Sequence, residues 1–126
     1  MGLDNGIFKI NRQDLPLKIE DVTIYGYIHF EVCYWRKCWH FRDSLISRAS
    51  IEDHKLGNSN CYEIDDENID MVIETLTYCI LEAIEDEDDD WEDSDWNRIN
   101  LANLLLIKED IISPNPKYRY FFYDSY

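Results

Sequence analysis

Two large aromatic residues are followed directly by two cations in one short segment of the chain, Tyr34-Trp35-Arg36-Lys37, and His40 comes soon after it. Guanidinium and ammonium groups hold phosphates, and aromatic faces or arginine planes stack on bases. The carboxyl-terminal tail repeats this combination of residue types. The two segments together predict a nucleotide-binding site formed by Tyr34, Trp35, Arg36, Lys37, His40, Arg119, Tyr123 and Tyr126.

The first segment also has a purely structural interpretation. Trp35 and Trp39 would then belong to the hydrophobic core. The neighbouring cations would extend over apolar surface or pair with the many carboxylates of this chain. The sequence leaves both interpretations open.

Carboxylates concentrate in residues 85–95, which carry nine of the 27 acidic residues. A calcium-binding loop of the EF-hand type would need Gly at its sixth position and Glu at its twelfth, but Trp91 and Asn97 stand there. We expect a solvated acidic loop. The alternative is a surface that imitates the phosphates of a nucleic acid and occupies the basic groove of a protein.

Thiols and imidazoles suggest metal binding, because the chain has four cysteines and three histidines. Structural zinc sites use two closely spaced ligand pairs, and the second pair is missing here. We therefore expect reduced thiols and no bound metal. The sequence contains no nucleophile elbow, phosphate-binding glycine loop or dinucleotide fingerprint. A non-enzymatic protein without a cofactor is the expectation.

The formal net charge of −15 disfavours direct binding to nucleic acid, because phosphates would be repelled. No apolar run is long enough for a membrane helix, and the amino terminus lacks the order of a signal peptide. We expect one domain over residues 1–126 that remains in the cytoplasm, away from membranes.

Hydrophobic periodicity gives the elements that would position these residues. The expected strands cover residues 6–10, 61–64 and 118–123, with a further strand or hairpin in 22–32. The expected helices run from 34 to 49, from 69 to about 84–87, and from Ser94 or Asp95 to the residues before Pro114.

This order of elements favours an α+β fold, namely a small, mostly antiparallel sheet with about three helices packed on one face. The first and last strands are expected to pair. The last helix is apolar nearly all round, which indicates contact on more than one side and predicts a homo-oligomer.

Three segments carry a resemblance: Met1-Gly2-Leu3-Asp4-Asn5-Gly6, Glu31-Val32-Cys33-Tyr34-Trp35-Arg36-Lys37 and Phe122-Tyr123-Asp124-Ser125-Tyr126. Together they resemble small bacteriophage and prophage proteins that begin Met-Gly-Leu-Asp and carry a Tyr-Trp-Arg-Lys segment. The resemblance implies a phage protein in the host bacterial cytoplasm. Such a setting suggests an anti-defence protein that sequesters a nucleotide immune signal. The alternative is an acidic mimic that blocks a host defence protein.

Overall fold

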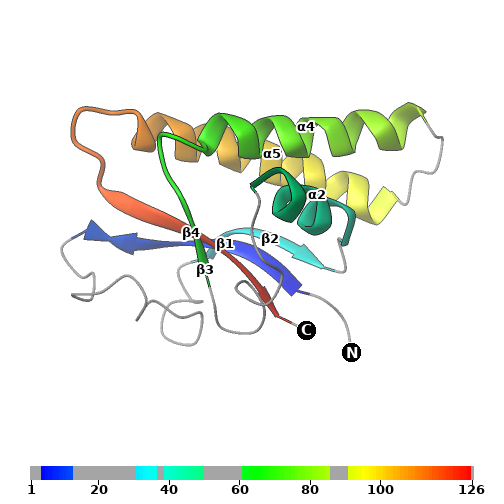
Figure 1. The fold of residues 1–126 in the computed structure, drawn as a ribbon, viewed down its shortest axis with the longest axis horizontal. Helices are drawn as coiled ribbons and strands as arrows, with labels where there is room; N and C mark the ends of the chain where they lie inside the picture. Colours follow the sequence, from blue (N-terminus) through cyan, green and yellow to red (C-terminus); the bar gives the residue numbers. More distant parts are fainter. Residues whose placement is uncertain (1–3, 13–30, 37–38, 50–60, 86–90, 126) are drawn as a thin grey trace.

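The computed structural model describes residues 4–12, 31–36, 39–49, 61–85 and 91–125. In these residues, four antiparallel strands form one sheet, and three helices cover one of its faces (Figure 1). The strands are β1 (Asp4–Asn11), β2 (Glu31–Arg36), β3 (Cys61–Ile64) and β4 (Tyr118–Ser125). The helices are α2 (Trp39–Ala49), α4 (Ile69–Glu85) and α5 (Trp91–Ile111). The predicted α+β class is confirmed.

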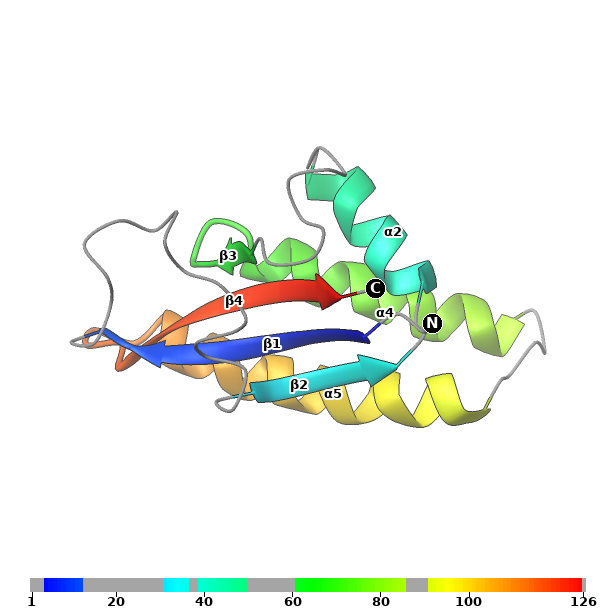
Figure 2. The ribbon, with the colours of Figure 1, turned by 90° about the horizontal axis from the view of Figure 1, so that it is seen from below.

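The centre of the sheet is the pair formed by β1 and β4, as expected for the first and last strands. The strand order is β2-β1-β4-β3, so β2 and β3 are the edges (Figure 2). Ile7 lies opposite Phe122, and Phe8 lies opposite Phe121. Successive side chains of a strand point to opposite faces, which explains why the first pair joins the core under the helices and the second forms a separate buried cluster.

Helix α4 begins at a reciprocal cap. The Asp65 carboxylate accepts hydrogen bonds from the N–H groups of Glu67 (3.0 Å) and Asn68 (3.2 Å), while the Asn68 side chain accepts one from the Asp65 N–H (2.9 Å). Such a cap satisfies amides that lack a partner at a helix start. The apolar stripe predicted for this helix is only partly buried. Ile69, Val72 and Leu76 are buried. Ile73, Ile80 and Ala83 are half-buried, and Ile84 is 55% exposed.

Helix α5 begins at Trp91, earlier than the expected Ser94 or Asp95. Within the described chain only one face of α5 is buried.

The prediction of a helix from Tyr34 is wrong. Strand β2 continues through Arg36, and α2 begins only at Trp39. The ladder with β1 decides this, because Tyr34 and Trp35 pair with Gly6 and Asn5. Residues 22–30 of the second predicted strand lie outside the described residues.

Candidate functional site

The sheet brings part of the predicted nucleotide site together at one end. Gly6 of β1 lies between Tyr34 of β2 and Tyr123 of β4. Arg119 lies four residues back along β4, opposite Ile10, so about 13 Å of strand separates it from Tyr123. The eight predicted residues therefore do not form a single cluster.

Trp35 is a core residue. It is fully buried, and its ring stacks on Phe41 with the centroids 4.7 Å apart. The indole N–H donates to Asn97 Oδ1 at 3.0 Å. The structure thus agrees with the structural interpretation for Trp35, because neither its ring face nor its N–H is available to a base.

Tyr34 lies on the edge strand β2, and its backbone is hydrogen-bonded to a side chain of α5. The buried Asn100 accepts a hydrogen bond from the Tyr34 N–H (3.2 Å) and donates one to the Tyr34 carbonyl oxygen (2.5 Å). The Tyr34 ring meets Trp96 edge-on. An exposed edge strand invites pairing with another chain, so this amide closes part of the edge.

Tyr123 spans the strand β1. Its hydroxyl donates to the Glu31 carboxylate on β2, and the residue is only 1% exposed. A Cβ atom at Gly6 would lie 2.5 Å from Tyr123 Cε1 and 2.8 Å from the Cys33 carbonyl oxygen. Glycine at position 6 therefore permits the ring to cross.

The remaining residues of the first segment add little to a pocket at this end. His40 is exposed on α2, with Nε2 2.8 Å from Glu82 Oε2. The Arg36 side chain lies outside the described part of the structure, as do Lys37 and Tyr126.

Arg119, by contrast, lines a pocket of about 330 Å³ at the opposite end of the sheet. Three segments that are distant in sequence form it. The connection from β3 to α4 and the connection from α5 to β4 lie side by side at this end (Figure 1). The lining comprises Arg12, residues 63–66, residues 111–113, Pro116 and residues 118–120.

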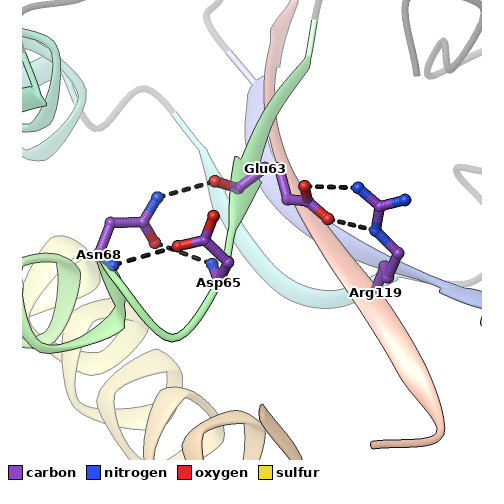
Figure 3. A network of polar contacts seen from close by, with 4 residues as sticks. All are labelled: Glu63, Asp65, Asn68 and Arg119. Carbon is purple, nitrogen blue, oxygen red and sulfur yellow. Dashed lines mark hydrogen bonds and ion pairs between the residues drawn. The ribbon is translucent and has the colours of Figure 1, made fainter. Parts of the chain in front are cut away.

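Charges of both signs line this pocket. Arg119 is held by Glu63 in a two-pronged ion pair (Figure 3), and hydrogen bonding to Glu63 raises the pKa of the guanidinium further. Asp65 is engaged in the cap of α4. The exposed Arg12 and Asp66 therefore carry the pocket charges that are most accessible to a ligand.

Asp110 holds the aromatic wall of the pocket, which consists of Tyr118 and Tyr120. Its carboxylate accepts hydrogen bonds from the N–H groups of Lys117 (3.0 Å) and Tyr118 (3.3 Å) and from the Tyr120 hydroxyl (2.8 Å). Burial alone would raise the pKa of Asp110, but these hydrogen bonds and Arg12 lower it. The start of β4 is thereby tied to the end of α5.

The tyrosines of this wall differ in exposure. Tyr118 is partly exposed, and Lys9 Nζ lies 4.2 Å from its ring centroid. Tyr120 is 5% exposed, and burial together with Asp110 raises the pKa of its hydroxyl. Tyr120 is consequently protonated at neutral pH.

Sequence reasoning missed Arg12 and Tyr118. The signal for Tyr118 was present, since the tail alternates cations and tyrosines from Lys117 onward. Arg12 follows the first strand by itself, and only the fold brings it to this pocket.

Among the described residues, no three His, Cys, Asp or Glu side chains gather in a way that could hold a metal ion. The described thiols at Cys33 and Cys79 are free. Burial raises the pKa of Cys33, and it raises the pKa of Cys79 to about 11. These two thiols are poor nucleophiles, because the thiolate is the reactive form. Nor does any described helix have the length and apolar character needed to cross a membrane.

Comparison with known proteins identifies no relative. No protein-family model matches the chain, and neither a curated protein nor a solved structure matches it. Function must therefore be argued from the chemistry of the pocket.

Proposed function

We propose that this chain is a non-enzymatic protein that binds and sequesters a nucleotide. The observation that carries the proposal is the pocket at the start of β4, where two arginines, carboxylates and tyrosines meet. Its volume of about 330 Å³ lies at the lower end of the range for small-molecule sites. The proposed site therefore lies around Arg119 and does not include the Tyr34 segment.

The mixture of charges favours a nucleotide over a simple anion. Arg12 offers donors to a phosphate, whereas Asp66 and the other carboxylates would repel one. The exposed Asp66 carboxylate can accept hydrogen bonds from the amino group of a base. Tyr118 supplies an aromatic surface against which a base can pack. One ligand that carries both a phosphate and an amino-bearing base satisfies both halves of the pocket.

The state of the lining groups favours sequestration over turnover. Glu63 is committed to Arg119, and the Tyr120 hydroxyl is held by Asp110. Neither histidine nor cysteine occurs among the described residues that line the pocket. A general base with a pKa near neutrality is the usual requirement for hydrolysis, and these residues do not supply one.

The biological setting is part of the proposal. The three segments that resemble phage proteins favour an anti-defence role, in which removing a nucleotide signal from solution disables the host response. Because sequestration works by stoichiometric binding, the dissociation constant for the nucleotide would need to lie well below the concentration of the signal.

The alternative of an acidic mimic receives less support. Exposed carboxylates along α4 lead toward the acidic run, but Asp70, Glu74 and Glu82 are paired with Lys108, Arg48 and His40. Replacing Asp86, Asp88, Asp89 and Asp90 by Asn separates the two functions. Sequestration predicts unchanged nucleotide binding, whereas mimicry predicts the loss of a protein target.

Titration calorimetry with a panel of cyclic and linear nucleotides tests the proposal. Arg12→Ala removes a charge-assisted hydrogen bond worth about 1.5–3 kcal/mol and should weaken binding by about 10- to 100-fold. Arg48→Ala is the matched control, because it removes an arginine from α2, outside the pocket. Failure of every nucleotide to bind, or equal binding by both variants, would refute the proposal.

A further inference from the structure

Helix α5 carries an apolar stripe on the side that faces away from its own sheet. Ala102 and Leu105 lie on one line with Arg98 and Glu109, at spacings of four, three and four residues. Residues spaced in this way share one face of a helix. All four are exposed, whereas the inward face of α5 is buried. We define these four residues as the α5 seam.

Large apolar side chains border the α5 seam. Ile99 is 55% exposed and Leu106 is 64% exposed, and Leu105 within the seam is 51% exposed. Isolated exposed apolar residues are ordinary, but several on one helical face indicate a contact surface. The feature is separate from the nucleotide pocket, which α5 lines with its last residue, Ile111, and with none of the four seam residues.

The charges of the α5 seam indicate what kind of surface would bind to it. A cation stands at its amino-terminal end and an anion at its carboxyl-terminal end. A two-fold axis midway between Ala102 and Leu105 would bring Arg98 opposite Glu109 of an identical antiparallel helix. The same axis would set the small Ala102 against the large Leu105. The seam is therefore complementary to itself in both charge and size.

We propose that the α5 seam docks on the α5 seam of a second copy of this chain, forming an isologous antiparallel dimer. Neither Arg98 nor Glu109 makes a salt bridge in the described residues, so both remain available for this contact. The seam is neutral although the chain is strongly acidic. Another acidic surface of the protein would repel its copy, whereas this one would not.

Charge reversal with rescue tests the proposed geometry. Sedimentation equilibrium at about 1 to 200 μM should give a dimer for the unmodified chain and a monomer for Leu105→Lys. Arg98→Glu alone and Glu109→Arg alone each create two like-charge contacts per dimer, so each should raise the dimer dissociation constant about tenfold. The double variant R98E/E109R restores both pairs and should recover the original constant within about twofold.

Arg48→Glu provides the matched control, because it makes the same change of charge on α2, away from the seam. It should leave the dissociation constant unchanged, and circular dichroism should confirm that every variant is folded. A monomeric unmodified chain at the highest concentration would overturn the proposal. So would a dimeric L105K variant, or a double variant no tighter than either single variant.

Discussion

The edge clamp between Asn100 and Tyr34 gives the sharpest test of how α5 holds the sheet. Asn100→Ala removes the acceptor of the Tyr34 N–H and the donor to the Tyr34 carbonyl oxygen. A fully buried group left without a partner costs about 1–3 kcal/mol, but Tyr34 is only partly buried and water can replace part of the loss. We expect the free energy of unfolding to fall by about 2 kcal/mol, which corresponds to a melting temperature lower by about 6–10 °C.

Urea denaturation followed by circular dichroism measures this change. Asn103→Ala is the matched control, because Asn103 lies on the same helix and gains the same helix propensity, about 0.5 kcal/mol. The two variants should differ by about the full value of the clamp. If both variants shift the midpoint equally, the hydrogen bonds to Tyr34 do not stabilise the fold and the reasoning fails. A clamp-deficient chain should also aggregate more readily, since the β2 edge is then open.

Three further predictions concern stability. Gly6→Ala places a methyl group against the Tyr123 ring and the Cys33 carbonyl oxygen, so it should lower the free energy of unfolding by about 1–3 kcal/mol. An unchanged midpoint of urea denaturation would contradict this packing. Asn5→Leu should leave the free energy of unfolding unchanged or raise it by about 1 kcal/mol, because the Asn5 amide is buried without a hydrogen-bond partner in the described structure. A fall of more than about 2 kcal/mol would show that the amide does have a hydrogen-bond partner. The pKa of Asp110 is lowered in the folded state, so its contribution to stability is present above about pH 4 and is lost as the pH falls through that lowered pKa. Asp110→Asn should therefore make the free energy of unfolding less dependent on pH in acid. An unchanged pH dependence would contradict this role of Asp110.

Local patterns predicted the elements whose stability is local. The spacing of Ile69, Val72 and Leu76 predicted α4 closely. The sequence offered both Asp65 and Asp66 as its cap, and the structure uses Asp65. The aromatic run from Tyr118 indicated β4, and its pairing with the first strand was expected from their order. These features depend on periodicities that a short segment contains by itself.

The errors arose where distant contacts decide the conformation. Trp35 fits a helical spacing with Trp39 and Arg42, yet pairing with β1 keeps residues 34–36 extended. Trp35 therefore entered the core instead of a binding surface. The pocket could not be predicted in full, because Arg12 and Asp66 line the same pocket only when three separate segments converge.

The central position of the pair β1 and β4 has a consequence for how the protein is made. Asn11 pairs with Tyr118, which is 107 residues later in the chain, and closing a loop of that length costs about 4 kcal/mol of chain entropy. During synthesis, β1 therefore leaves the ribosome long before the strand that completes its ladder. Its apolar residues, including Ile7 and Phe8, stay accessible to chaperones until translation reaches β4. Assembly of this sheet therefore waits until β4 has been synthesised, and any nascent chain that stops before residue 118 lacks the centre of the sheet.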